Sequence, residues 1–403
     1  MSRLTLVFIT IFVDLIGFGI VLPLLPFYAQ DFGASPAVIG AVVAVHPATQ
    51  FIFAPFWGRL SDRYGRRPIL LVGLLGSGLS YLVFGFATSL AWLFASRIVA
   101  GAVGANVPVV QAYIADSTKP EDRTRGMGLV GAAFGLGFVV GPAIGGGLSH
   151  FGYGVAGLFA AAISFANALV AFALLPETRK REPRPGSATG RAIGIPARVW
   201  QAVRFARQPT LRFVLSLVVL VTFVFAGLTT VFPLLIAREL SYGARHAGYL
   251  LAFLGLIMAI VQGKLIGPLA RRFNERRLIV AGFLMLTIGY GIMPLARGLL
   301  MICVALLFIG VGTALDWPSL NGLASKYAGA DVQGAILGVL QSLSGLARVG
   351  GAVWAGWTFG RWSPAAPFVL SSLLMSLAVV LAVWFMIRMP DPPSAPVEVG
   401  IPV

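Results

Sequence analysis

The sequence is poor in charged and chemically reactive side chains. Only 11% of its 403 residues are charged, and it contains one cysteine and three histidines. The single cysteine, Cys303, excludes an intrachain disulfide. The histidines at positions 46, 150 and 246 lack the spacing of a metal site, and no phosphate-binding loop with Lys and Ser or Thr is present. We therefore expect neither an enzyme nor an ATP-driven protein, and no bound metal or organic cofactor.

Apolar residues are present in excess. They make up 58% of the chain, and the mean hydropathy is +0.89, well above the values of soluble domains. The composition predicts a protein that lies in a lipid bilayer. The formal net charge of +16 could suggest a nucleic-acid partner. The basic residues lie in loops between apolar runs rather than along one face, so nucleic acid is not an expected partner.

Twelve apolar runs are long enough to cross a membrane as helices. They predict an all-α membrane protein with twelve transmembrane helices, at about 4–28, 37–57, 69–88, 90–113, 126–148, 153–175, 211–236, 246–267, 278–296, 298–322, 333–357 and 365–387. The first run carries Asp14 and is followed by Pro23 and Pro26 instead of a small-residue cleavage site, so we interpret it as a retained helix and not as a signal peptide.

The basic residues also predict the orientation. With both termini in the cytoplasm, the cytoplasmic side receives 23 of the 30 Lys and Arg residues, as the positive-inside rule requires. The exceptions are Arg238, Arg245, Arg297 and Arg361 on the opposite side, and Arg97, Lys264 and Arg348 within helices. Lys264 is close enough to a helix end to reach the interface. We expect a multi-pass protein of a bacterial inner membrane.

A short basic pattern occurs twice. The segment Gly58-Arg-Leu-Ser-Asp-Arg-Tyr-Gly-Arg-Arg-Pro68 joins two apolar runs, and Gly267-Pro-Leu-Ala-Arg-Arg-Phe-Asn-Glu-Arg-Arg277 does the same in the second half. Such duplication is typical of secondary transporters, which bind substrate between two related halves. It predicts two pseudo-symmetric six-helix bundles, at 1–175 and 211–390, joined by a cytoplasmic linker at 176–210 and followed by a tail at 391–403. The linker is charged and rich in Pro and Gly, and its part 195–207 suits either a surface helix or a plain connector.

Four charged residues lie deep within the predicted helices. A charge in the bilayer costs at least about 2.5 kcal/mol, so each one suggests a function. Asp14 and Arg97 fall in the first and fourth helices, and Asp316 and Arg348 in the tenth and eleventh. Asp14 is a candidate proton carrier, and the alternative is a static ion pair with Arg97. Asp316 is a candidate for proton or cation binding, and the alternative is a structural salt bridge to Arg348.

The repeat relates Asp316 to a residue of the first half. Superposing the halves aligns Asn106-Val-Pro108 with Asp316-Trp-Pro318. Pseudo-symmetric helices take equivalent places, so we expect Asn106 and Asp316 to face a central cavity from opposite sides, each beside a Pro that frees backbone carbonyls.

The first basic loop resembles the loop motif of the major facilitator superfamily, and most closely that of its drug/proton antiporters. The resemblance implies a gating role for Gly58, Asp62, Arg63, Gly65, Arg66 and Arg67. Asp62 would contact a helix N-terminus of the other half. In the second copy Arg271 and Asn274 replace Asp62 and Gly65, which predicts asymmetric gate contacts.

Two further segments resemble motifs of the same family. Arg97-Ile-Val-Ala-Gly101-Ala-Val-Gly104 is similar to the fourth-helix motif, whose arginine is associated with proton transfer. The fifth-helix segment is similar to the antiporter motif through Gly135, Gly141, Pro142, Gly145 and Gly146; generic tight helix packing is the alternative.

Over almost the whole chain the sequence is similar to the tetracycline efflux pumps. It departs from them at Ser80-Tyr81, where those pumps have an acidic residue, and Asp316 is particular to this chain. These departures weaken the expectation that tetracycline itself is the substrate, and multidrug or tetracycline-like efflux remains the expected function.

The resemblance and the buried charges together predict a monomeric, proton-coupled exporter of small lipophilic or amphipathic compounds. Candidate substrate-binding residues are polar or aromatic side chains on apolar helices: His46, Gln50, Asn106, Gln111, Phe225, Trp317 and Gln341. The alternatives are a proton-coupled carrier of a metabolite or lipid, and a membrane receptor or scaffold without transport. The fifth-helix motif weighs against import of a metabolite or lipid, and a receptor or scaffold gives no reason for Asp14, Arg97 and Asp316 in the bilayer.

Overall fold

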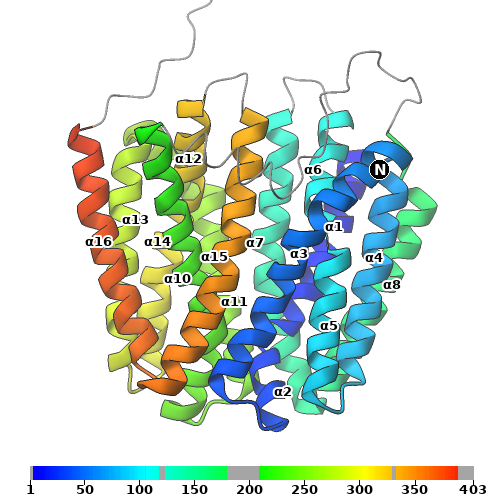
Figure 1. Cartoon of the computed structure of the whole chain (residues 1–403), viewed down its shortest axis with the longest axis horizontal. Helices are drawn as coiled ribbons and strands as arrows, with labels where there is room; N and C mark the ends of the chain where they lie inside the picture. The colour runs from blue at the N-terminus through cyan, green and yellow to red at the C-terminus, as the bar shows by residue number, and fades with distance from the viewer. Residues whose placement is uncertain (1–2, 105, 118–122, 179–207, 329–332, 389–403) are drawn as a thin grey trace, which may run out of the picture.

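The chain folds into long helices that lie side by side (Figure 1). The computed structural model describes residues 3–104, 106–117, 123–178, 208–328 and 333–388, and the regular structure in these residues is helical. The first half contains α1 (Arg3–Val21), α2 (Leu25–Asp31), α3 (Pro36–Tyr64), α4 (Arg66–Gly85), α5 (Leu90–Val103), α6 (Asn106–Ser117), α7 (Arg123–Leu148) and α8 (Tyr153–Leu174). The second half contains α10 (Pro209–Leu240), α11 (Ala244–Ile260), α12 (Ile266–Arg272), α13 (Glu275–Ile292), α14 (Leu299–Ala328), α15 (Gln333–Arg361) and α16 (Ala366–Arg388).

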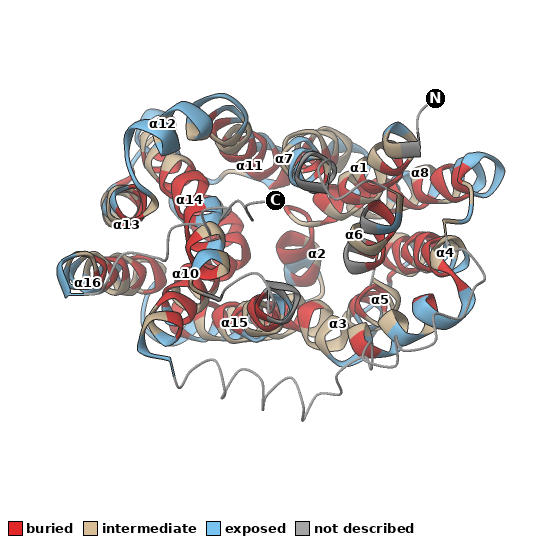
Figure 2. Cartoon of the chain, turned by 90° about the horizontal axis from the view of Figure 1, so that it is seen from above, coloured by how far each residue is buried: buried red, intermediate tan, exposed pale blue. Residues whose placement is uncertain are grey.

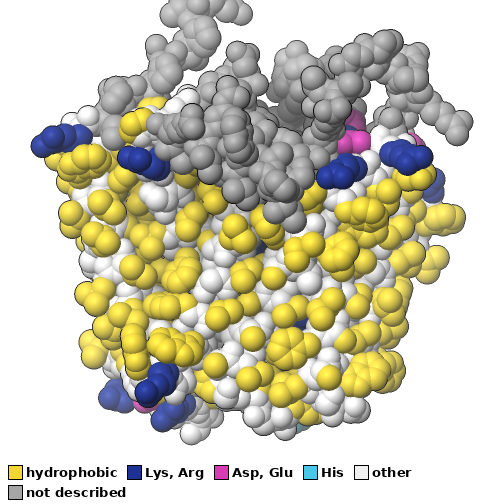
Figure 3. Space-filling model, viewed as in Figure 1, with side chains coloured by type: hydrophobic (Ala, Val, Ile, Leu, Met, Phe, Trp, Pro, Cys, Tyr) yellow, Lys and Arg dark blue, Asp and Glu magenta, His cyan; other side chains and the backbone are white. Residues whose placement is uncertain are grey.

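The predicted fold class is confirmed. Within the described residues, 10 helical spans are long and apolar enough to cross a membrane. The other two expected crossings are α15 and the pair formed by α5 and α6. Apolar side chains form a broad band on the outer face, with Lys and Arg at its two edges, as a bilayer-spanning protein requires (Figure 3). Most of the predicted linker, including 195–207, and the tail at 391–403 lie outside the described residues, so the predicted domain boundaries stay predictions.

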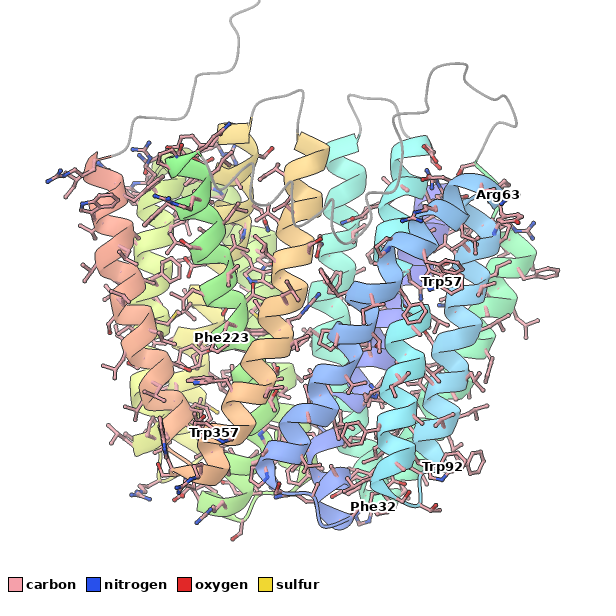
Figure 4. The ribbon with its side chains drawn as sticks, viewed as in Figure 1. Phe32, Trp57, Arg63, Trp92, Phe223 and Trp357 are labelled. Carbon is pink, nitrogen blue, oxygen red and sulfur yellow. The ribbon has the colours of Figure 1, made fainter. Side chains whose placement is uncertain are left out.

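The fourth crossing, expected as one helix over 90–113, is divided between α5 and α6. Breaking a helix within the bilayer exposes backbone carbonyl groups, which must then find other donors. Side chains of α3 supply them. The Gln50 amide donates to the Gly104 carbonyl at 2.7 Å, and the Trp57 indole, which points from α3 in Figure 4, donates to the Ala102 carbonyl.

The two halves meet closely at one end of the bundle. We call the end that carries the loops at 58–68 and 267–277, at the top of Figure 1, the basic end. Near the opposite end, α3 packs along α15 and α7 packs along α11. A Cβ added at Gly40 would lie 2.5 Å from the Ala352 carbonyl oxygen, and one added at Gly248 would lie 2.5 Å from the Pro142 carbonyl oxygen. Only glycine allows backbones to approach this closely.

The same four crossings are not in close contact near the basic end. A Cβ at Gly58, Gly131 or Gly338, or at Gly263 in the π-helical turn Val261–Leu265 that continues α11, would meet no atom of another segment within 4 Å. The exposed side chains of Phe56 on α3 and Ile260 on α11, at 52% and 47%, lie in the same parts of these helices. The halves therefore touch at the opposite end and separate toward the basic end.

Replacing Gly248 by leucine should destabilise this arrangement. The larger side chain would push against the backbone of α7, and overpacking of this kind costs about 1–3 kcal/mol. We expect the melting temperature of the purified protein in detergent to fall by several degrees. Gly263→Leu, on the same crossing but in open space, is the control and should melt like the wild type. Equal melting temperatures for the two variants would contradict the close contact.

Candidate functional site

Asp14 lies in the middle of α1, where its carboxyl group faces α6. The Asn106 side-chain amide donates to Asp14 Oδ2 at 3.0 Å, and Ser77 of α4 lies beside the same group. Asp14 Oδ1 is buried and has no hydrogen-bond partner. The residue is thus held on one oxygen and free on the other, an arrangement that can accept a proton without displacing a protein partner.

Arg97 of α5 is buried, with 3% of its surface exposed. Its Nε donates to Ser96 Oγ at 3.3 Å, its guanidinium lies 5.6 Å from the centre of the Phe84 ring, and its Nη2 has no hydrogen-bond partner. No ion pair joins it to Asp14 among the residues that the structure describes. The static pair considered from the sequence is therefore not formed.

Tyr81 of α4 is a buried residue near both of these charged groups, and the sequence reasoning gave it no role. It is 4% exposed and interacts electrostatically with both Asp14 and Arg97. Its ring packs on Gly17 of α1, where an added Cβ would lie 2.8 Å from a ring carbon. A phenol side chain in the apolar part of this helix was the signal available in the sequence.

Asp316 of α14 is completely buried, and neither carboxyl oxygen has a hydrogen-bond partner in the described structure. The expected alternative, a salt bridge to Arg348, is not formed. The carboxyl group instead fills the space above Gly282 of α13, where a Cβ would lie 2.1 Å from Oδ1. An unpaired carboxylate at this depth would be very costly, so the group fits its neutral, protonated form.

The predicted symmetry between Asn106 and Asp316 has a structural counterpart. The Asn106 side chain fills the space above Gly73 of α4 in the same way that Asp316 fills the space above Gly282 of α13. The prediction that Asn106 and Asp316 both face a central cavity is wrong. Asn106 is 5% exposed and Asp316 is not exposed, because each packs onto a neighbouring helix of its own half.

His46 and Arg348 lie where the two halves meet. The His46 ring lies 5.5 Å from the Phe18 ring of α1, and His46 interacts electrostatically with both Arg97 and Arg348. Arg348 of α15 has a buried Nε without a hydrogen-bond partner. His46, Arg97 and Arg348 thus form one basic cluster across α5, α3 and α15.

The remaining predicted substrate-binding residues are spread over several helices. Gln50 binds the carbonyl of Gly104, which gives its amide a structural partner. The Phe225 ring of α10 lies 6.3 Å from the Phe138 ring of α7, across the two halves. Trp317 is 39% exposed and Gln341 is also exposed, whereas Gln111 is half-buried.

The predicted gating motif occupies the turn between α3 and α4 at the basic end, where Figure 4 labels Arg63. Arg66 donates to Asp62 at 2.6 Å and to Asp116 of α6 at 2.9 Å. Asp62 was expected at a helix N-terminus of the other half. Here it pairs with Arg66 within its own half, and half of its side chain is exposed, because the two halves are apart at this end.

Glu177, which follows α8, holds the start of α4. Its carboxylate oxygens accept hydrogen bonds from the backbone N–H groups of Arg66 and Arg67, at 3.0 and 3.2 Å. A carboxylate is favoured there by the free N–H groups and by the helix dipole. Gly65 has a φ of 104°, and a Cβ at this position would lie 2.5 Å from a Glu177 oxygen. Gly65 thus leaves space for the Glu177 carboxylate, although the sequence had assigned Glu177 to the linker.

The glycines of the fifth-helix motif pack against both halves. Gly141 contacts the backbone of α1 at Gly19, and Gly145 contacts it at Ile20. Gly146 contacts α11 at Gly248, and Pro142 lies within the same stretch of α7. Gly135, nearer the basic end, has only a distant contact with Ala259. The motif therefore serves close helix approach at the end where the halves meet.

This architecture, with buried charges at a junction of two helical halves, defines a secondary transporter. The family model described as Major Facilitator Superfamily matches residues 7–351 and 264–400, and the chain belongs to this family. The tetracycline resistance protein of class C from Escherichia coli is 35% identical over 353 residues, 85% of this chain and 86% of that protein. Multidrug resistance protein 2 of Bacillus subtilis is 28% identical over 93% of each chain. The solved structure of the human organic anion transporter MFSD10 superposes with a TM-score of 0.71 at 28% identity, over 94% of this chain and 98% of that one.

Replacing Glu177 by glutamine should weaken the start of α4. The amide keeps an acceptor oxygen but loses the charge that favours the helix N-terminus, so we expect a loss of about 1 kcal/mol in stability. Thermal melting in detergent measures it. Glu239→Gln, which removes an acid from the exposed pair with Arg297, is the control and should have little effect. A melting temperature of Glu177→Gln equal to that of the control would contradict the capping role.

Proposed function

We propose that the chain exports small lipophilic or amphipathic compounds across the inner membrane in exchange for protons. The observation that carries the proposal is the state of Asp14, a carboxyl group in the middle of a membrane helix, with one partnered oxygen and one free oxygen. The names of the tetracycline and multidrug resistance relatives support export of such compounds. We also propose that the basic end is cytoplasmic, so that the structure corresponds to an inward-open state.

In the proposed cycle, opening to the outside lets Asp14 take a proton, and the protonated carrier releases substrate. Opening to the cytoplasm lets the proton leave and substrate bind. One proton moving through a potential of 100 mV supplies about 2.3 kcal/mol, enough for an accumulation ratio of several tens. The proposed second proton site is Asp316 in the second half, whose buried carboxyl oxygens have no hydrogen-bond partner in the described structure. We propose that the carrier works as a monomer and needs no cofactor besides the proton.

The Asp14→Asn protein should lose proton coupling. The amide cannot release a proton, so adding substrate should no longer move protons. The measurement uses purified protein in liposomes that contain a pH-sensitive dye, challenged in turn with lipophilic cations, tetracyclines and neutral drugs. Asp31→Asn, an exposed acid at the end of α2, is the control and should behave like the wild type. Normal proton movement by Asp14→Asn would exclude Asp14 as the carrier.

The Asp316→Asn protein tests the second site in the same assay. We expect it to fold, because the amide has nearly the shape of the neutral carboxyl group above Gly282. The number of protons released per substrate bound should fall relative to the wild type. An unchanged proton number would leave Asp14 as the sole proposed carrier and assign Asp316 a structural role.

A further inference from the structure

The basic cluster of His46, Arg97 and Arg348 has no acidic counterpart in the described structure. Neither arginine forms an ion pair with a described residue, and each has a buried N–H group without an acceptor. Only 3% of the Arg97 surface is exposed, so water does not supply an acceptor for its buried Nη2 group. A guanidinium inside a membrane protein normally pairs with an acid or a carbonyl group, which marks this cluster as unusual.

The packing of the helices brings the three residues together. Figure 2 shows α3 between α5 and α15. On one side, an added Cβ at Gly101, one turn from Arg97, would lie 2.4 Å from the His46 carbonyl oxygen. On the other side, Gly40 packs against Ala352 and Phe51 lies near Gly345, so His46 falls at the level of Arg348. The cluster therefore spans the junction of the two halves.

The two buried acids are already placed elsewhere. Asp14 accepts a hydrogen bond from Asn106 and forms no ion pair with Arg97 among the described residues. Asp316 rests on Gly282 and has no partner. Neither acid neutralises the cluster, so two permanent positive charges remain available at the junction.

We propose that Arg97 and Arg348, with His46 between them, bind the acidic group of an amphipathic organic compound. The proposal rests on the transport function, for which it names a chemical requirement of the substrate. A planar guanidinium binds carboxylates through strong, charge-assisted hydrogen bonds, and a bound acid would satisfy the N–H groups that lack acceptors. The contact joins α5 of one half to α15 of the other, so a bound acid group bridges the halves.

Proton exchange adds a second requirement. A bound acid group repels a nearby ionised carboxylate, and that repulsion opposes release of the proton from Asp14. A substrate exchanged for protons must therefore also carry a group that favours proton release. A basic nitrogen near Asp14 would do so. The exported compounds are expected to combine an acidic and a basic group.

The test compares two ligands that differ only in charge. Isothermal titration calorimetry of the purified protein measures binding of 1-naphthaleneacetate and of its neutral amide, 1-naphthaleneacetamide. We expect the carboxylate to bind at least tenfold more tightly. In Arg348→Gln the affinity for the carboxylate should fall about tenfold, while the affinity for the amide stays the same. Arg348→Lys, which keeps the charge, should restore part of the affinity.

Arg361→Gln, on the same helix but exposed at its end, is the matched control and should bind both ligands like the wild type. Competition by inorganic phosphate would identify a site for small anions in general, and its absence a site for organic acids. Equal affinities for acid and amide, no binding of the carboxylate at millimolar concentration, or an equal loss for both ligands in Arg348→Gln would overturn the proposal. Proton movement driven by a compound that carries both an acidic and a basic group, measured with wild type and with Asp14→Asn, tests the proposed function separately: its loss in Asp14→Asn alone supports exchange for protons whatever the outcome of the binding test.

Discussion

Close contact between the backbones of the two halves is the constraint on which the rest of the structure depends. Lipid provides little hydrophobic drive for helix association, so the halves are held by van der Waals packing between surfaces without side chains. Gly40 and Gly356 provide that surface on α3 and α15, and Gly146 and Gly248 provide it on α7 and α11. These contacts lie at one end only. They leave the basic end apart and place the charged residues just beyond the closed region.

The two halves of the duplicated fold carry an ion pair at corresponding places, but the acidic and basic partners are exchanged. In the first half Arg66 of α4 pairs with Asp116 of α6, and in the second half Glu275 of α13 pairs with Lys326 of α14. The bond occupies equivalent places with its charges reversed. The neighbouring arginines stack in both halves: Arg67 lies 5.4 Å from the Phe172 ring and Arg276 lies 5.5 Å from the Phe385 ring. The helix arrangement therefore requires an ion pair at this place, whereas it does not fix which helix carries the acid and which the base.

Hydropathy and loop charge were enough to predict the helices, the fold class and the basic end, because both properties act over whole segments. Individual partners were harder. Asp14 was found because a carboxyl group in an apolar run is conspicuous, but its contact with Asn106 and its separation from Arg97 depend on how α1, α4 and α6 are rotated about their axes. Glu177 was assigned to the linker because spacing along the chain does not reveal that it returns to the start of α4. The division of the fourth crossing at Gly104 was missed because the donors that satisfy it come from another helix.

The absence of an ion pair between Asp14 and Arg97 in the described structure supports the proposed coupling to a modest energy source, the proton gradient. Breaking a buried ion pair costs about 3–5 kcal/mol, whereas one proton in a 100 mV potential supplies about 2.3 kcal/mol. A direct pair between Asp14 and Arg97 would thus oppose each cycle by more than one proton provides. The described structure avoids that cost, because the Asn106 amide holds one oxygen of Asp14 and no ion pair joins the acid to Arg97 among the described residues. A neutral amide partner lets Asp14 change its protonation state in the proposed cycle without first breaking an ion pair.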